Sequence, residues 1–330
     1  MVTITDIASA LGITPSTVSR ALSGSPRVKE ETRVAVQQMA DSMGYRPNII
    51  ASNLRKGRSD IVGIVVPRIN REFFSNCISG AESVLQKAGY SVLILQTNED
   101  FETEIRALKT LRNYNVAGVL MSHAITSQDS SHIKPNIGDI PLVQFDRIFR
   151  DIPGAKITGA NFDGAYIATR HLIENGYKRI GTIAGYMNAA PYAERLAGYR
   201  KALEDNGIPY DESIVFKNAI VRETGCSAAL RALECGCDAL YSAGDFSALG
   251  AIEALSGQKV RIPEEFGIVG TANEFFTSLT TPSLSSLGQQ PFEMGQEAAR
   301  AFLSGSSEEI VIPMELHIRQ SSNRNKIWQK

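Results

Sequence analysis

Short hydroxyl side chains and one arginine are concentrated near the N-terminus, in the stretch Thr14-Pro15-Ser16-Thr17-Val18-Ser19-Arg20-Ala21-Leu22. Hydroxyl and guanidinium groups are donors of the kind that bind phosphates and base edges in DNA. Thr14 can cap a helix, and Pro15 suits the first helical position, where its missing N–H has no consequence. The apolar residues of such a helix share one face, which we expect to be buried: Val18, Ala21 and Leu22.

A second short helix is predicted immediately upstream, over residues 5–12, with Thr3 or Thr5 as its cap and Gly12 as its end. Two short helices joined by a tight turn form a helix-turn-helix, whose second helix enters the DNA major groove. A third helix, from about Lys29 to Met43, completes a small core. A capped amphipathic helix alone is usually structural, but the tandem pair with this polar face favours DNA binding.

The pattern changes from Ile61, where short continuous apolar runs begin to alternate with helical stretches. Strands are predicted at 61–66, 91–95, 116–121 and 141–145, and a second block at 179–184, 238–242 and 266–270. The predicted helices are 73–88, 101–114, 164–175, 193–206, 223–234 and 246–256, followed by a helix at 291–303 and a strand at 310–316. Alternating buried strands and helices form parallel sheets covered on both faces, so we expect two α/β lobes with a ligand cleft at the strand ends.

Charge is distributed unevenly along the 330 residues. Residues 1–58 carry 8 Lys/Arg against 4 Asp/Glu, hence 8 − 4 = +4, and the remainder carries 26 − 31 = −5, which together give the net charge of −1. A basic N-terminal segment followed by a mildly acidic remainder is typical of a chain whose N-terminal domain binds phosphates. No apolar run approaches the roughly 18 residues that span a bilayer, and no apolar signal core is present near the N-terminus, so we expect a cytoplasmic protein without a membrane partner.

Motifs of enzymes and metal sites are missing from the sequence. There is no Gly-x-Gly-x-x-Gly after a strand, no Gly-Lys-Ser/Thr phosphate loop and no Gly-x-Ser-x-Gly elbow. Cys235-Gly236-Cys237 could be half of a metal site, but no second Cys or His pair stands nearby, and the four cysteines suit reduced thiols. We therefore predict no catalytic residue, no metal and no cofactor. A periplasmic-type solute receptor would share the two-lobed core, but the helix-turn-helix argues against it.

Three motifs give the chain a specific resemblance: Val2-Thr3-Ile4-Thr5-Asp6-Ile7-Ala8, Thr17-Val18-Ser19-Arg20-Ala21-Leu22 and Gly44-Tyr45-Arg46-Pro47-Asn48. With them the chain resembles the lactose-repressor/galactose-repressor family of bacterial regulators, and the similarity continues through most of its length. The resemblance implies a homodimeric, sequence-specific DNA-binding transcriptional regulator, with a repressor favoured. A small molecule bound between two lobes of a periplasmic-binding-protein-like α/β core would control its affinity for operator DNA.

The resemblance also implies domain boundaries: a helix-turn-helix domain at 1–47, a hinge at 48–58 and an effector-binding and dimerisation domain at 59–330. Lobe one is expected at about 59–159 and 291–318, and lobe two at about 160–290 and 319–330, so the chain would cross between lobes three times. The segment 49–58 is either a plain linker or, as the resemblance favours, a hinge helix that folds only on DNA and inserts Leu54 into the minor groove. No heptads follow residue 323, so no coiled-coil tetramer is expected.

Carried over position by position, the resemblance places DNA contacts at Thr5, Thr14, Pro15, Ser16, Thr17, Ser19, Arg20, Asn48, Ala51 and Leu54. It places effector contacts at Phe73, Phe74, Asp146, Arg195, Asn273 and Gln290. Four of these residues have a plainer interpretation: a surface arginine for Arg195, an interlobe structural carboxylate for Asp146 and core packing for the two phenylalanines.

The sequence departs from the family pattern at two places. It reads Gly244-Asp245 where Asn-Asp is common, so Asp245 is expected mainly to cap a helix. It reads Gly270-Thr271-Ala272-Asn273 where many members have Gly-Phe-Asp-Asp, so a carboxylate is missing and Asn273 is expected to replace part of its role. A neutral or acidic carbohydrate is the favoured effector class. A charged sugar derivative, a phosphorylated metabolite and a purine-like molecule remain alternatives.

Overall fold

The computed structural model describes residues 2–45 and 59–324, and the chain divides into two compact units, 1–59 and 60–330. The predicted hinge helix lies outside the described residues, together with its candidate DNA contacts Asn48, Ala51 and Leu54. The two units are described separately below.

The N-terminal unit contains the three predicted helices, α1 (Ile4–Leu11), α2 (Pro15–Leu22) and α3 (Glu30–Ser42). Thr3, rather than Thr5, caps α1, because its side chain accepts the backbone N–H of Asp6, whose carboxylate in turn accepts the backbone N–H of Thr3. Thr14 caps α2 in the predicted way, with Pro15 in the first turn. The helices pack around a core of small and β-branched side chains: Ile7, Ala8, Val18, Ala21, Val36 and Ala40.

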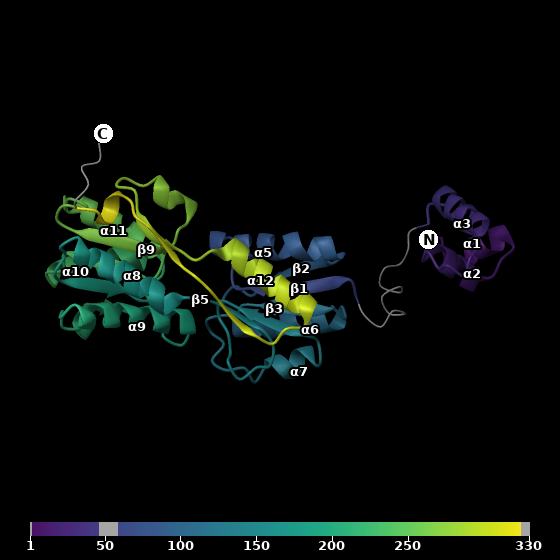
Figure 1. Ribbon diagram of the computed structural model, residues 1–330, viewed down its shortest axis with the longest axis horizontal. Helices are drawn as coiled ribbons and strands as arrows, with labels where there is room; N and C mark the ends of the chain where they lie inside the picture. Colours follow the sequence, from purple (N-terminus) through teal and green to yellow (C-terminus); the bar gives the residue numbers. More distant parts are fainter. Residues whose placement is uncertain (1, 46–58, 325–330) are drawn as a thin grey trace. The chain divides into compact units, whose positions relative to one another are not determined.

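Lobe one is a six-stranded parallel sheet in the order β11-β5-β4-β3-β1-β2 (Figure 1). Its strands are β1 (Ile61–Val66), β2 (Ser91–Gln96), β3 (Gly118–Met121), β4 (Leu142–Phe145), β5 (Lys156–Gly159) and β11 (Glu309–Ile312). One face packs against α5 (Glu72–Leu85) and α12 (Pro291–Ser304), and the other against α6 (Phe101–Asn113) and α7 (Ile133–Ile137). Each face of the sheet therefore has its own apolar core, as expected for a sheet whose central strands β1 and β3 carry no polar side chain.

Lobe two repeats this architecture with the strand order β12-β10-β9-β8-β6-β7. Its strands are β6 (Ile180–Ile183), β7 (Val215–Phe216), β8 (Ala239–Ser242), β9 (Gly267–Ala272), β10 (Ser285–Gly288) and the antiparallel β12 (Glu315–His317). Helices α8 (Asn161–Glu174) and α9 (Ala190–Asp205) cover one face, and α10 (Arg222–Glu234) and α11 (Asp245–Gly257) cover the other.

The chain passes between the lobes after β5, after β10 and after β11 (Figure 1). The predicted single strand over 310–316 is wrong, because it is two strands: β11 pairs with β5 in lobe one, and β12 pairs with β10 in lobe two. Pro313 separates them, and a proline has no N–H with which to continue a ladder. The last crossing therefore falls at residues 313–314, earlier than the expected limit of lobe one at 318.

Candidate effector cavity and DNA-binding helix

A cavity of about 340 Å³ lies between the two lobes, at the carboxyl ends of their strands. Lobe one contributes residues that follow β1 and β4 and the first turn of α5, including Arg68, Arg71, Phe73, Phe74, Asp146 and Arg147. Lobe two contributes residues of α9, of α11 and of the segment after β9, including Tyr192, Arg195, Asp245, Phe246 and Glu274. Four of the six predicted effector residues are therefore brought together here: Phe73, Phe74, Asp146 and Arg195.

Arg195 lies in the second turn of α9 and is only 5% exposed, so the interpretation as a surface arginine is wrong. Its Nε donates to Asn161 Oδ1 at 2.9 Å, and its Nη1 donates to the carbonyl oxygen of Ala243 at 2.9 Å. Its remaining nitrogen, Nη2, has no hydrogen bond to any residue that the structure describes. The side chain is thus held in place by lobe two and keeps donors for a ligand.

Asp146 directly follows β4 in a left-handed backbone conformation, with φ of 58°, and is buried. Ser122 Oγ donates to its Oδ2 at 3.4 Å, and Arg147 Nε lies 4.0 Å from the same oxygen. Burial raises the pKa of Asp146, and the nearby Arg147 and Arg195 oppose that shift. Among the described residues of lobe two, none forms a hydrogen bond with this carboxylate, which weakens the interpretation as an interlobe structural group.

Phe73 and Phe74 form an edge-to-face pair with ring centroids 5.1 Å apart. Both rings belong to the apolar core beneath α5 and also line the cavity. The two interpretations of this pair, core packing and cavity wall, are therefore compatible.

Asn273 and Gln290 lie elsewhere than expected, beside a smaller hollow of about 210 Å³. Both have positive φ, 54° for Asn273 and 50° for Gln290. The amide oxygen of Asn273 accepts a hydrogen bond from Arg319 Nη2 at 2.7 Å. This geometry does not support the expectation that Asn273 substitutes for the missing carboxylate, because Asn273 does not line the main cavity and its amide oxygen is already bonded.

Two carboxylates, Asp245 and Glu274, occupy the lobe-two wall instead. Gly244 is the N-cap of α11, so Asp245 is not the expected cap; its oxygens accept from Ser286 Oγ at 2.6 Å and from the Glu274 backbone N–H at 2.9 Å. Burial raises the pKa of Asp245 to about 6. Burial, followed by the charges of Asp245 and Glu72, raises the pKa of Glu274 to about 7. Groups with such shifted pKa values are typical of functional clefts.

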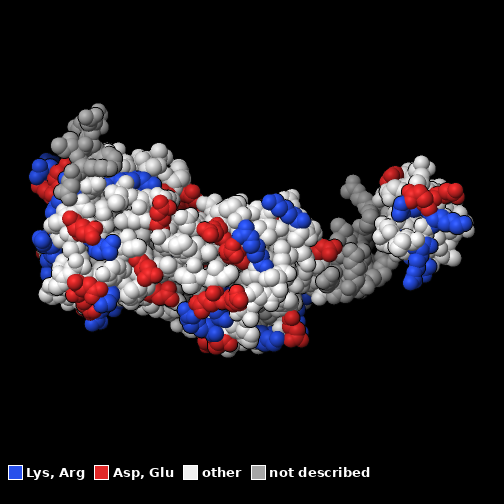
Figure 2. Space-filling model, in the orientation of Figure 1, with Lys and Arg blue, Asp and Glu red and all other residues white. Residues whose placement is uncertain are grey.

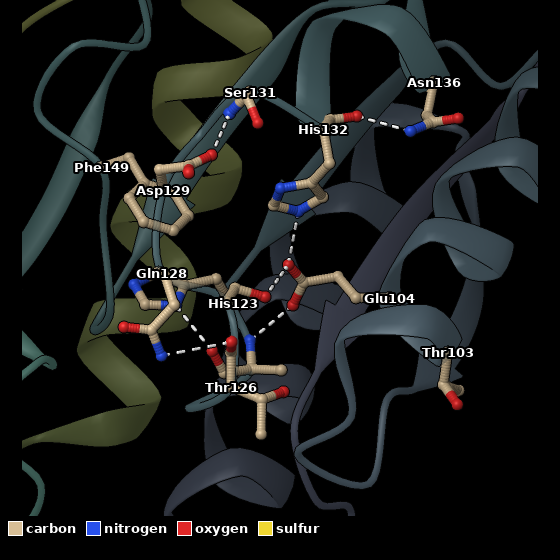
Figure 3. A network of polar contacts seen from close by, with 12 residues as sticks. Thr103, Glu104, His123, Thr126, Gln128, Asp129, Ser131, His132, Asn136 and Phe149 are labelled. Carbon is tan, nitrogen blue, oxygen red and sulfur yellow. Dashed lines mark hydrogen bonds and ion pairs between the residues drawn. The ribbon is translucent and has the colours of Figure 1, made fainter.

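The loop that brings Ile125 to the cavity is fixed by two carboxylates, Glu104 and Glu99, of which Figure 3 shows Glu104. Glu104 is fully buried and accepts from the Ala124 N–H, from Ser127 Oγ at 2.8 Å and from His132 Nε2 at 2.7 Å. Glu99 accepts the Ile125 N–H at 2.8 Å and forms a forked pair with Arg147, at 2.7 and 3.2 Å. The charge of Arg147 is therefore already compensated within lobe one.

In the N-terminal unit, the outer face of α2 carries the predicted polar residues. Pro15, Ser16 and Arg20 are exposed, Thr17 and Ser19 are half-buried, and Val18 and Ala21 are buried. The Thr14 hydroxyl lies 2.9 Å from the hydroxyls of Ser16 and of Thr17, so these groups order one another at the start of the helix. Thr5 is exposed on α1, and Figure 2 shows Lys and Arg side chains at the surface of this unit.

Within residues 2–45 and 59–324, no cluster of His, Cys, Asp or Glu side chains could hold a metal ion. In the same described part of the chain, no helix is both long enough and apolar enough to span a bilayer.

Two family models match the chain, one for each unit. Residues 3–48 match the bacterial regulatory proteins of the lacI family, and residues 59–325 match the periplasmic binding proteins and sugar binding domain of the LacI family. The chain belongs to the LacI family.

Individual LacI-family proteins are similar over nearly the whole length. The HTH-type transcriptional repressor PurR of Haemophilus influenzae (strain PittEE) is 30% identical over 308 residues, which are 92% of this chain and 90% of PurR. The transcriptional regulator CelR, solved in complex with cellobiose, is 27% identical with a TM-score of 0.73, covering 97% of this chain and 100% of CelR. The lac repressor dimer, solved with operator and the anti-inducer ONPF, has a TM-score of 0.86 at 23% identity, covering 97% of this chain and 99% of that one.

These relatives are transcriptional regulators and not enzymes. The predicted fold class, a helix-turn-helix unit followed by a two-lobed α/β core with parallel sheets, is confirmed. The chain is a LacI-family transcriptional regulator with a DNA-binding domain and an effector-binding core.

Proposed function

We propose that this chain is a homodimeric repressor whose affinity for operator DNA is controlled by a sugar or sugar derivative bound in the interlobe cavity. One observation carries the proposal: the cavity takes its walls from both lobes. A ligand held there makes different contacts when the lobes open or close, and can therefore shift the balance between the two arrangements. CelR, which was solved with cellobiose, supports a carbohydrate as the class of ligand.

Four residues are assigned to effector binding. Arg195 donates to ligand hydroxyls or to a carboxylate, and Asp146 accepts from hydroxyls. Phe73 and Phe74 supply an apolar wall against which a sugar ring can pack. Asn273 and Gln290 are left out of this set because they do not line the cavity.

Operator binding is assigned to α2 in the major groove, through Pro15, Ser16, Thr17, Ser19 and Arg20, with Thr5 and Thr14 beside it. One such helix reads half of a two-fold symmetric site, which supports a dimer. The segment after β9 offers an apolar surface for the partner, since Phe275 and Leu279 are 68% and 71% exposed.

A thermal-shift screen of sugars, sugar acids and nucleobases, followed by one variant, tests the effector assignment. A ligand at about 100 times its Kd stabilises the fold by about 2.7 kcal/mol. Arg195→Ala should abolish this stabilisation and the response of operator binding to the ligand, while operator affinity without ligand stays near that of the wild type. Arg200→Ala, an exposed arginine on the same helix, is the matched control. If Arg195→Ala responds normally, the ligand lies elsewhere and the assignment is wrong.

A further inference from the structure

Two arginines lie at the edge of the cavity with their donors unused. Arg68 and Arg71 follow β1 at its carboxyl end, and both line the cavity. Their guanidinium groups form neither an ion pair nor a hydrogen bond with any residue in the described part of the chain. Arg147 on the same wall differs, because Glu99 binds it with two hydrogen bonds. Lobe one therefore presents two guanidinium groups whose donors no described residue uses, although the carboxylate of Glu274 in lobe two interacts with Arg71 through its charge.

Arg71 is also held in a defined orientation. Its guanidinium carbon lies 3.9 Å from the centroid of the Phe246 ring, which belongs to lobe two. A guanidinium stacked on an aromatic face keeps its in-plane N–H groups available for forked bonds to a carboxylate or phosphate. The stack thus orders the side chain across the cavity without using its donors.

Lobe two adds further groups suited to an anion. Arg195 is 5% exposed, lines the cavity and retains Nη2 without a bond to a described residue. Helices α5 and α11 begin at the cavity with Arg71 and Gly244 as N-caps, and neither helix has a side-chain cap. Uncapped N-terminal N–H groups carry partial positive charge, so they favour an anion in the cavity.

The acidic groups of lobe two keep oxygen atoms available for ligand hydroxyls. Asp245 accepts from Ser286 and from the Glu274 N–H, and neither Asp245 nor Glu274 forms an ion pair with a described residue. Carboxylate oxygens accept hydrogen bonds from ligand hydroxyls. The cavity therefore combines an edge of arginines with unused donors and a wall of hydrogen-bond acceptors.

We propose that the effector is an anionic polyhydroxy compound, a sugar acid or a sugar phosphate, whose charged group binds Arg68 and Arg71 and whose hydroxyls donate to Asp245 and Glu274. This inference rests on the proposed function, because it names the ligand class of the same cavity. Sugar acids and sugar phosphates share the chemistry that these residues recognise, and the experiment separates them.

The test uses calorimetric titration and thermal shift of the full chain at constant ionic strength. The probes are glucuronate, gluconate, glucose 6-phosphate and inorganic phosphate, each compared with neutral glucose. We expect the anionic probes to bind at least about tenfold more tightly than glucose, since charge-assisted hydrogen bonds are about twice as strong as neutral ones. A larger gain for glucose 6-phosphate than for the two carboxylates identifies a phosphate ligand, and the reverse identifies a sugar acid.

Variants link the preference to the two arginines. Arg68→Gln and Arg71→Gln should each weaken binding of the anionic probes by about tenfold to a hundredfold and weaken binding of glucose much less. Arg71→Lys, which keeps the charge but loses the planar fork, should fall between wild type and Arg71→Gln. Arg106→Gln, an exposed arginine on α6 away from the cavity, is the control and should bind like the wild type.

Several results would overturn the inference. The inference is wrong if glucose binds as tightly as its anionic counterparts, or if no anionic probe binds. It is also wrong if both glutamine variants still bind the anionic probes as tightly as the wild type does. The proposed function fails differently: a probe whose binding is unaffected by Arg195→Ala is not held in this cavity. If a neutral sugar binds and Arg195→Ala abolishes its binding, the assignment of the effector cavity stands and only the preference for anions is wrong.

Discussion

The ionisation of Glu274 is governed by its burial and by the charges around it. Asp245 on α11 and Glu72 at the start of α5 face it as like charges, and Arg71 is the nearby cation that favours its ionised form. Burial and the two acids outweigh Arg71, so the pKa of Glu274 rises from 4.5 to about 7. A carboxyl group that resists ionisation in the folded state makes the stability of the protein depend on pH.

The sign of this dependence can be worked out. The pKa of Glu274 is higher in the folded state than in the unfolded state. Its favourable contribution to the free energy of unfolding is therefore fully present below pH 4.5 and is lost as the pH rises through about 7. At pH 8 the free energy of unfolding of Glu274→Gln should therefore exceed that of the wild type by about 1–3 kcal/mol. At pH 5 the two free energies should be closer. Urea titrations at pH 5, 6, 7 and 8 measure this, with the exposed Glu102→Gln as control. Parallel pH profiles for wild type and Glu274→Gln would contradict the assignment.

The sequence predicted correctly those site residues that lie in the cavity because of their place after a strand or near the start of a helix. Asp146 and Arg195 line the cavity because they follow a strand end or open a helix at the cleft. Arg68, Arg71 and Glu274 were missed, although all three follow strands at the same edge and the strand-end rule would have included them. Asn273 and Gln290 were misplaced because side-chain direction there depends on left-handed backbone conformations, which non-glycine residues adopt only where tertiary structure imposes them.

At the scale of the element, α2 is the clearest prediction of function. Arg20 is exposed in its last turn, where a guanidinium can bond two acceptors of one guanine. Arg20→Ala should cost about 1–3 kcal/mol of operator affinity and relax the sequence preference at one position. Selection from a randomised operator library measures the preference, and Arg33→Ala on α3 is the control. An unchanged preference would remove Arg20 from base recognition.

The loop between β3 and α7 depends on one side chain of α6. Glu104 receives three hydrogen bonds from this loop in a buried site, so its loss leaves several donors unpaired (Figure 3). Glu104→Ala should lower the free energy of unfolding by about 3 kcal/mol. Urea titration measures the loss against Glu102→Ala, which removes an exposed carboxylate from the same helix and should change little. Equal stabilities of the two variants would show that the network contributes nothing.

Elements were predicted correctly where the sequence is continuously apolar, as in Ile61–Val66 and Gly118–Met121. Lys156–Gly159 and Ser285–Gly288 were missed because half or more of their residues are polar or glycine, and only pairing with neighbouring strands makes them part of a sheet. Residues 310–316 are divided between two sheets, which is likewise a tertiary feature. Pro313 indicates that the strand is interrupted, but it does not indicate to which lobe each half belongs.

At the scale of the whole molecule, the two lobes of the core touch beside the cavity. The backbone N–H of Phe275 in lobe two donates to Glu72 Oε2 at 2.6 Å, and Asn188 Nδ2 donates to the carbonyl oxygen of Ile125 at 2.7 Å. Arg71 stacks on Phe246 at the same interface. These few polar contacts can be exchanged for water at little cost, which is the requirement for lobes that open and close around a ligand.

Dimerisation is proposed through the exposed apolar residues after β9. Leu279→Asp should convert the dimer to a monomer, because a buried charge at a self-complementary interface meets its own copy across the two-fold axis. Operator affinity should fall with it, since a monomer reads only half of the site. Light scattering and gel-shift titration measure the two effects, and Tyr114→Asp, at an exposed apolar residue elsewhere on the core, is the control. A stable dimer in Leu279→Asp would place the interface elsewhere.

Control of operator binding by an effector implies a coupling free energy that must be the same in both directions. A coupling of about 1–3 kcal/mol changes operator affinity by about 5- to 150-fold, and operator DNA must then change effector affinity by the same factor. Calorimetric titration of the effector with and without a saturating operator duplex measures one direction, and gel-shift titration with and without effector measures the other. A duplex of random sequence is the control and should leave effector affinity nearly unchanged. Effector affinity that is identical with and without operator would mean that the interlobe cavity does not regulate DNA binding, even if the ligand occupies it.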